Sequence, residues 1–259
     1  MKTEFPNSAA LAAEADAVHA REAGGKPAAA GRMRPRDAAT LLVLDRSGPA
    51  PRVLMGRRHP GHKFMPDKFV FPGGRAERAD AAAPIASGLA PEVEAALIAR
   101  TTRGNPSRAR RLALAAIRET FEETGLVIGR KQATPTPVAV SGVWGDFLAT
   151  GHLPDLAPIR YLARAITPPG RTKRFDTRFF IVEADAIRHT IGDVVGPDSE
   201  LTELAWLTIE ETISQPLPVI TRIILGELEK RLAAGGIEAP APVPFYYRIG
   251  KEFRRELIA

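Results

Sequence analysis

"RETFEETGL" occupies Arg118–Leu126 and is the stretch that decides which fold we expect. It closes a run with helical periodicity, whose bulky apolar side chains fall on one face at about 100° per residue: Leu114, Ile117 and Phe121. Three carboxylates gather on roughly the opposite face of the same helix: Glu119, Glu122 and Glu123. The sequence therefore predicts a helix with one packing face and one acidic face.

The acidic face lacks the basic neighbours that usually relieve repulsion between carboxylates one turn apart. Arg118 can pair with Glu122, whereas Glu119 and Glu123 have no Lys or Arg three or four positions away. An ordinary solvated helix face is one explanation. The other is a hard divalent cation such as Mg²⁺, which takes oxygen ligands and often binds phosphates at the same time.

A second stretch, "FVFPGG" at Phe69–Gly74, is a strand-like run that ends in proline and two glycines. Alone it indicates only a turn. Glycine lets the backbone approach a ligand or a metal closely, so Gly73 and Gly74 are candidates for contact with a bound ligand or metal.

Together the two stretches resemble the Nudix box, G-x5-E-x7-R-E-U-x-E-E-x-G-U, where U is a bulky aliphatic residue. Gly74 takes the place of the opening glycine, and Asp80 lies where the family has its first glutamate. Arg118–Leu126 matches the second half, with Thr120 replacing an aliphatic residue. The second half follows much later than in the pattern, which implies a helical insert at about 81–107 that splits the box.

The split box and "RTKRFDTRFFIVEA" (171–184) are similar to the animal peroxisomal coenzyme A diphosphatases and their bacterial relatives. This resemblance implies an α+β fold, an α/β/α sandwich with a mixed sheet between helices. It divides the chain into an N-terminal extension (1–35), a Nudix domain (36–235) and a C-terminal tail (236–259).

Periodicity and turn residues predict the elements of that domain independently. The expected strands cover 38–47, 51–60, 68–74, 136–144, 159–167, 176–184 and 202–208. The expected helices cover 91–104, 106–125 and 216–236.

The family resemblance implies hydrolysis of a diphosphate linkage with Mg²⁺ or Mn²⁺. It assigns Glu122 and Glu123 as metal ligands, and Glu119 as a third ligand or as the residue that orients the attacking water. The main-chain carbonyl of Gly74 completes the expected metal shell, and Arg118 is expected to pair with Asp80. The general base is left open, with Glu200 and Glu203 as further candidates.

Composition favours an anionic small-molecule partner. The net charge is +6 with a pI near 9.9, which suits nucleotides or phosphorylated metabolites, although a basic surface also simply aids solubility. The chain has no cysteine, which excludes disulfides and cysteine nucleophiles. No apolar run approaches the roughly 20 residues of a membrane helix and no secretion signal stands out, so we expect a cytoplasmic protein.

Substrate recognition is expected from basic residues outside the box. Arg58 and Arg174 are the candidates, each within a basic run whose arginines can bind phosphate bidentately; solvated loops are the alternative for each. Coenzyme A or its acyl esters are the favoured substrates, with ADP-ribose, NADH, dinucleotides and capped RNA left open. A non-catalytic module that binds a nucleotide or RNA is the competing class, and a homodimer is possible because relatives often dimerise.

Overall fold

The computed structural model describes residues 33–61, 65–133, 140–170, 173–250 and 252–259. Its strands are β1 (Arg36–Asp45), β2 (Arg52–Arg58), β3 (Phe69–Val70), β4 (Gly73–Arg75), β5 (Leu126–Lys131), β6 (His152–Pro154), β7 (Arg160–Ile166), β8 (Phe175–Glu183), β9 (Ile187–Thr190), β10 (Leu201–Thr208), β11 (Val243–Ile249) and β12 (Glu252–Ile258). Its α-helices are α2 (Pro91–Ile98), α3 (Pro106–Thr124), α4 (Val143–Ala149), α5 (Ile209–Ile213) and α6 (Val219–Ala233). Two short 3₁₀ helices are η1 (Ala79–Ala82) and η2 (Ala184–Ala186).

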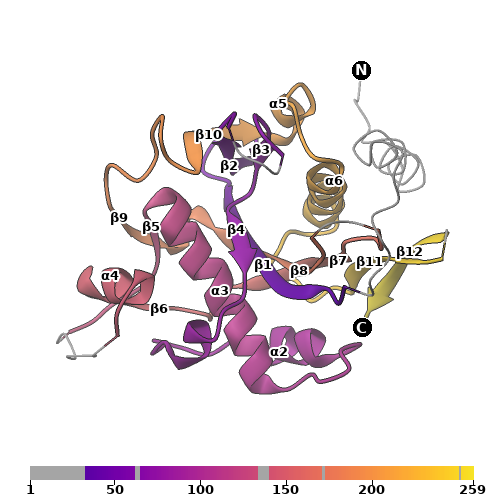
Figure 1. The fold of residues 1–259 in the computed structure, drawn as a ribbon, viewed down its shortest axis with the longest axis horizontal. Helices are drawn as coiled ribbons and strands as arrows, with labels where there is room; N and C mark the ends of the chain where they lie inside the picture. The colour runs from indigo at the N-terminus through magenta and orange to yellow at the C-terminus, as the bar shows by residue number, and fades with distance from the viewer. Residues whose placement is uncertain (1–32, 62–64, 134–139, 171–172, 251) are drawn as a thin grey trace.

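A mixed sheet of nine strands forms the centre of the molecule (Figure 1). Its main path runs β10-β2-β1-β8-β7-β11-β12, while β3 pairs with β2 and β4 pairs with β1. β1 and β8 are parallel over Arg36–Leu44, whereas β1 is antiparallel to both β2 and β4. A second, three-stranded sheet has the order β6-β5-β9.

Helices cover both faces of the central sheet because successive strand residues point to opposite sides. Ala39, Leu41 and Val43 of β1 pack in the cluster that contains the apolar side chains of α2, α3 and α4. Leu42 and Leu44 pack in the cluster that contains α6. The α/β/α sandwich expected from the sequence is therefore present, with α3 and α6 on opposite faces.

α3 is the helix that the sequence predicts, and residue choice fixes both of its ends. Asn105 is the N-cap, and its side chain accepts a hydrogen bond of 2.8 Å from the backbone N–H of Arg108. Gly125 ends the helix in the left-handed region at φ 75°. A Cβ there would lie 2.4 Å from the Ile191 carbonyl oxygen, so glycine is required for conformation and for space.

Three of the predicted elements differ from the structure. A strand was expected over 136–144, but the described part of it enters α4 at Val143. α2 ends at Ile98 instead of continuing to 104, because Arg100 has a left-handed φ of 55° and the Thr101 hydroxyl donates to the Leu97 carbonyl. The strand expected over 68–74 is divided into β3 and β4, which pair with β2 and β1 respectively. The other predicted strands and helices are present within a few residues of the expected bounds.

The segment expected as a C-terminal tail contains β11 and β12. β11 pairs in parallel with β7 and antiparallel with β12, so both strands extend the central sheet. Most of the expected N-terminal extension, 1–32, lies outside the described residues. Among the helices that the structure describes, none has the length and apolar character to cross a membrane.

Candidate active site

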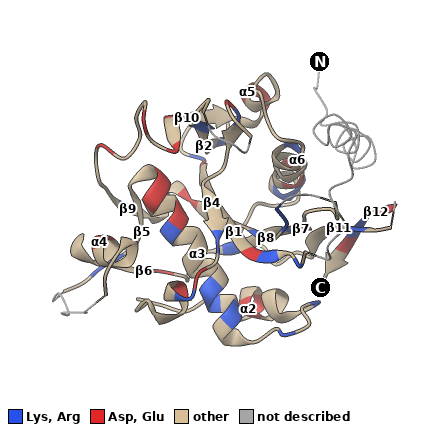
Figure 2. Cartoon of the chain, in the orientation of Figure 1, with Lys and Arg blue, Asp and Glu red and all other residues tan. Residues whose placement is uncertain are grey.

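The three glutamates lie on the last two turns of α3, beside β4 and β10. The Glu122 side chain is 50% exposed and the Glu119 side chain 15% exposed, whereas Glu123 is buried. Figure 2 shows this acidic end of α3 beside β4, with basic residues at the α2 end of the same helix. The apolar face predicted for this helix is buried in the core and consists of Leu114, Ile117 and Phe121.

The two glycines of β4 bring its backbone against these carboxylates. The Gly73 N–H donates to Glu123 Oε2 over 3.1 Å. A Cβ on Gly74 would lie 2.4 Å from the Glu119 carboxylate carbon, so a larger residue would displace that side chain. β4 is held in this position by pairing with β1, where Gly74 faces Ala39.

Arg118 and Asp80 form the ion pair that the sequence predicts, even though a long insert separates them. Arg118 Nε donates to Asp80 Oδ1 over 2.7 Å, and Asp80 is fully buried. The same Asp80 oxygen accepts from Trp144 Nε1 at 3.0 Å, and Oδ2 accepts from the Glu77 N–H at 2.7 Å. Aspartate at this position is therefore fully hydrogen-bonded in spite of its shorter side chain.

Trp144 is the functional neighbour that sequence reasoning missed. Its ring lies in the core, as expected for a large aromatic residue, yet its N–H reaches a buried carboxylate. The signal in the sequence is weak, because Trp144 lies in a segment that was expected to be a strand rather than the first turn of α4.

Arg118 also contacts two of the three glutamates. Its Nη2 lies 2.9 Å from Glu119 Oε1, and its Nη1 lies 3.2 Å from Glu122 Oε2. Nη2 donates in addition to the Arg75 carbonyl of β4 at 2.8 Å. One buried guanidinium therefore links η1, β4 and the acidic face of α3.

Burial, with repulsion from neighbouring carboxylates, raises the pKa values of Glu119 and Glu123. Burial raises the pKa of Glu119 to about 7 against the charge of Arg118, and the charge of Glu122 adds to the rise. Burial also raises the pKa of Glu123 well above its ordinary value, and the charges of Glu200 and Glu119 add to it. Two buried carboxylates with raised pKa values beside other acidic groups are typical of a functional site.

The donor atoms fit a hard divalent cation, since all of them are oxygens of carboxylates on one helix face. Within the described ranges, no three acidic or histidine side chains converge on one point that could hold an ion. The reason lies in the contacts just given, because Arg118 and the Gly73 N–H already engage the carboxylates. Their chemistry suits the ion, and binding would require the glutamates to exchange these partners for it.

Of the additional residues proposed from the sequence, Arg58 and Glu200 lie near the carboxylates. Arg58 Nη2 is 2.9 Å from Glu200 Oε1, and the charges of both residues act on Glu123. Glu203 instead faces Arg57 Nη1 at 3.8 Å. Of the two reserve candidates for a general base, only Glu200 is thus close enough to influence a box glutamate.

Arg174 lies elsewhere. Its Nε donates to the Thr167 carbonyl at 3.0 Å and its Nη1 to the Met33 carbonyl at 2.8 Å. Its backbone carbonyl pairs with the N–H of Arg36, whereas the glycines of β4 pair with β1 further along that strand. The structure therefore does not bring Arg174 together with the residues of α3.

No protein-family model matches the chain. Among solved structures, a Nudix hydrolase from Alicyclobacillus acidocaldarius is 24% identical with a TM-score of 0.57, and the match covers 81% of this chain and 100% of that one. The NUDIX domain of Shewanella oneidensis NrtR, solved with ADP ribose, is 11% identical with a TM-score of 0.43 and coverage of 82% and 97%. The mixed sheet, the helices on its two faces and the match to the Alicyclobacillus structure show that this chain has the Nudix fold.

Proposed function

We propose that the protein is a metal-dependent hydrolase that cleaves a diphosphate linkage in a nucleotide-containing metabolite. The observation that carries this proposal is the contact between β4 and the acidic face of α3. There Gly73 donates to Glu123, and Gly74 leaves room for the Glu119 carboxylate. A helix face that merely meets solvent needs neither a buried glutamate nor a strand of glycines against it.

The glutamates and Gly74 would hold Mg²⁺ or Mn²⁺: Glu119, Glu122, Glu123 and the Gly74 carbonyl. Such an ion would neutralise charge on phosphoryl oxygens and lower the pKa of a bound water. Arg118 is a positioning residue, because its contacts to Asp80, Glu119 and Glu122 fix the directions of the carboxylates. Its buried pair with Asp80 keeps the guanidinium in place when the glutamates change partners.

Glu200 and Arg58 are the residues beside the carboxylates best placed to act on substrate. Glu200 could accept a proton from water, since its charge already acts on Glu123. Arg58 could bind a phosphate oxygen, although it must then share its contact with Glu200. Arg174 takes no part in this proposal because its hydrogen bonds go to distant backbone carbonyls.

Coenzyme A or an acyl-coenzyme A is the favoured substrate, giving 3′,5′-ADP and phosphopantetheine or its acyl ester. The support for this choice is the resemblance of the split box and of residues 171–184 to coenzyme A diphosphatases. The basic character of the chain also suits a substrate that carries a 3′-phosphate in addition to its diphosphate. ADP-ribose, NADH and dinucleoside polyphosphates are the alternatives within the same chemistry.

Incubation with Mg²⁺ or Mn²⁺ and each of these compounds, followed by mass analysis of the products, tests the proposal. Release of 3′,5′-ADP from coenzyme A is expected, and Glu122→Gln should lower the rate by about 100-fold or more if Glu122 binds the ion. Glu210→Gln, an exposed glutamate on α5, is the matched control. A protein that binds one of the compounds but hydrolyses none of them would instead be a nucleotide-binding module.

A further inference from the structure

A cavity of about 610 Å³ opens at the other end of α3, where the helix begins. Its lining includes four arginines and one carboxylate. We call it the arginine cavity and define it by Arg34, Asp37, Arg103, Ser107, Arg108 and Arg111. It gathers side chains from the start of β1, from the segment before α3 and from the first turns of α3.

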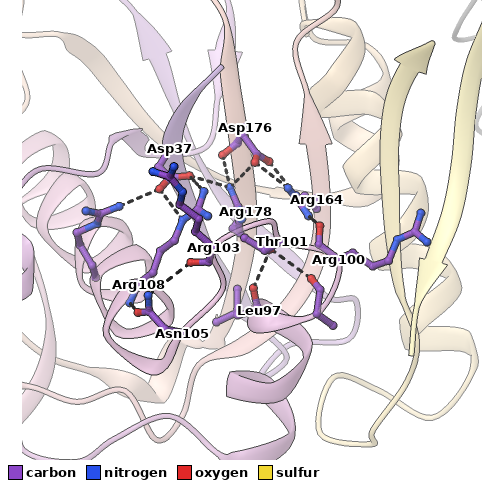
Figure 3. Close-up of polar contacts among 12 residues, drawn as sticks. Asp37, Leu97, Arg100, Thr101, Arg103, Asn105, Arg108, Arg164, Asp176 and Arg178 are labelled. Atoms are coloured by element: carbon purple, nitrogen blue, oxygen red, sulfur yellow. Dashed lines mark hydrogen bonds and ion pairs between the residues drawn. The ribbon is translucent and has the colours of Figure 1, made fainter. Parts of the chain in front are cut away.

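The wall of the arginine cavity is rigid because Asp37 binds several guanidinium groups at once. Asp37 accepts from Arg108 Nε at 2.9 Å and Nη2 at 2.6 Å, and from Arg111 Nη2 at 2.8 Å. Arg178 Nη1, fully buried behind it, lies 3.2 Å from Asp37 Oδ1. Figure 3 shows Arg108 and Arg178 reaching Asp37 from two sides.

A second carboxylate supports this wall from the sheet. Asp176 accepts from Arg164 Nε at 2.8 Å and Nη2 at 2.7 Å, and lies 3.0 Å from Arg178 Nη1. Figure 3 shows Asp176 between these two arginines. Arg108 and Arg111 are therefore anchored from behind, which lowers the entropy that these two side chains lose when they bind a ligand.

Positive charge exceeds negative charge in the cavity. Burial opposes ionisation of Asp37, but the hydrogen bond from Arg108 and the charges of Arg178, Arg108 and Arg111 hold its pKa below the ordinary value. Asp37 is thus a single negative charge among four arginines. In the part of the chain that the structure describes, Arg34 and Arg103 have no carboxylate partner, and Arg111 Nε is buried without a hydrogen-bond partner.

The beginning of α3 adds to this surplus. Ser107 lies in the first turn and lines the cavity, and that turn contains no acidic residue. Pro106 has no N–H and Asn105 accepts from the N–H of Arg108, so among the described residues the N–H of Ser107 is the free donor of this turn. The dipole of a 19-residue helix also favours an anion at this end. The helix end and the arginines therefore attract the same kind of ligand.

The arginine cavity is separate from the candidate active site but lies along the same helix face. Arg108 and Glu119 are three turns apart at about 100° per residue, which is roughly 16 Å along the axis. Figure 2 shows the basic and acidic ends of α3. One end of this face attracts cations and the other attracts anions.

We propose that the arginine cavity is a second anion site that binds a phosphate or diphosphate group. Guanidinium groups bind phosphate oxygens through paired N–H donors, and Arg34, Arg103 and the outer edges of Arg108 and Arg111 supply them. The group can belong to the far end of the substrate or to a separate phosphorylated molecule. The site itself does not depend on hydrolysis at the carboxylates.

Calorimetric titration of the full chain with pyrophosphate, without divalent metal, tests the site. Saturable binding of one pyrophosphate per chain is expected. Arg34→Ala/Arg103→Ala should weaken it by about tenfold or more, since two charged donors are lost. Arg254→Ala is the control and should leave binding unchanged. Arg254 is exposed, and among the carboxylates of the described residues it pairs only with Glu252.

Ser107→Asp separates loss of the site from loss of the fold. A carboxylate in the first turn of α3 favours the helix, so thermal stability without ligand should be kept or raised. The same charge should abolish pyrophosphate binding. Wild-type binding to Ser107→Asp or to the double arginine variant, or no saturable binding to the wild type, would overturn the proposal.

Kinetics then distinguish the two sources, and this arm alone rests on the proposed function. If the site holds a substrate phosphate, the double variant should raise KM for coenzyme A but not for dephospho-coenzyme A. If the site holds a separate molecule, added pyrophosphate should change the rates of hydrolysis of coenzyme A and dephospho-coenzyme A equally in the wild type. It should change neither rate in the double variant. If no compound is hydrolysed, the proposed function is wrong. The pyrophosphate titration still decides whether the arginine cavity is an anion site.

Discussion

At the scale of single residues, Asp80 fixes the positions of the groups that support the candidate active site. It is fully buried and joins Arg118, Trp144 and the backbone of Glu77. Asp80→Asn keeps the shape but removes the buried charge opposite Arg118, which then has only Glu119 and Glu122 as carboxylate partners among the described residues. The free energy of unfolding should fall by up to about 3–5 kcal/mol. Urea unfolding measures this, with exposed Asp198→Asn as the control. A loss as small as that of the control would contradict the central place given to Asp80.

Gly73 and Gly74 are neighbours, but a methyl group on each should have a different effect. On Gly73 it would lie 2.6 Å from the Ala39 carbonyl oxygen and 2.7 Å from Thr40 Cα, both backbone atoms, so Gly73→Ala should cost about 1–3 kcal/mol of stability. On Gly74 the three nearest atoms all belong to the movable end of the Glu119 side chain, so Gly74→Ala should lose activity with little loss of stability.

Thermal unfolding and product formation, measured on both variants, check this contrast. Gly88→Ala is the matched control, since nothing lies within 4 Å of a Cβ there. It should leave stability unchanged or raise it by about 0.4–1 kcal/mol, because alanine restricts the unfolded chain. Equal effects of the two β4 substitutions on both readouts would refute the separate roles.

Much of the site at this scale can be predicted from the sequence, because helix geometry is local. The period of about 100° places three glutamates on one face of α3, and the box pattern pairs Arg118 with Asp80 across the insert. The burial of Glu123 could not be predicted, since it depends on β4 and on the Glu200 segment before β10. Nor could the contact from Trp144, which requires the position of α4.

At the scale of elements, the hairpin of β11 and β12 is tied to α6 through Glu227. This buried carboxylate accepts from the Tyr246 hydroxyl at 2.6 Å and from Arg255 Nη2 at 2.9 Å, and it contacts Lys230 Nζ at 3.1 Å. Burial acts to raise the pKa of Glu227, but these hydrogen bonds outweigh it and hold the pKa below its ordinary value.

A lowered pKa in the folded state fixes the direction of the pH dependence. Charged Glu227 contributes stability at pH values above the unfolded carboxyl pKa of about 4.3, and this contribution is lost as the pH falls through the lower folded value. Glu227→Gln should therefore destabilise the protein near pH 7 and approach the wild type below about pH 4.

Urea unfolding of both proteins across this pH range measures the difference. Tyr246→Phe removes one donor without removing the charge, so its loss of stability should persist with a weaker dependence on pH. If the difference in the free energy of unfolding between the wild type and Glu227→Gln does not change with pH, the hairpin does not hold this carboxylate in its charged form.

Elements with strong periodicity were predictable, and those defined by distant pairing were not. β1, β8 and α3 have clear apolar patterns and appear at the expected positions. The residues of β11 and β12 alternate less clearly, and only pairing with β7 makes them part of the central sheet. The wrong strand at 136–144 has the same origin, because in α4 the Phe147 ring packs against both Phe121 of α3 and Trp144 of its own helix.

At the scale of the whole molecule, the parallel pair β1–β8 connects the two ends of α3. Gly73 and Gly74 pair with one side of β1, and β8 pairs with the other and supplies Asp176 and Arg178. The sequence predicts the layers through the family resemblance and the order of strands and helices, but it cannot predict this parallel register between strands more than a hundred residues apart. The arginine cavity depends on that register, so no local sequence motif predicts it.

Because α3 packs against η1, β1, β4 and β5, an ion that binds its glutamates in the folded state should stabilise the entire fold. At a Mn²⁺ concentration of about 100 times Kd, the gain in the free energy of unfolding should be about 2.7 kcal/mol. Thermal unfolding with and without Mn²⁺ measures it, with KCl at equal ionic strength as the salt control. Glu122→Gln should lose most of the gain and Glu210→Gln none of it, because Glu210 is exposed on α5, away from the acidic face. If Mn²⁺ stabilises the wild type and Glu122→Gln equally, the ion binds elsewhere. Metal chemistry at α3 would then lose its main support.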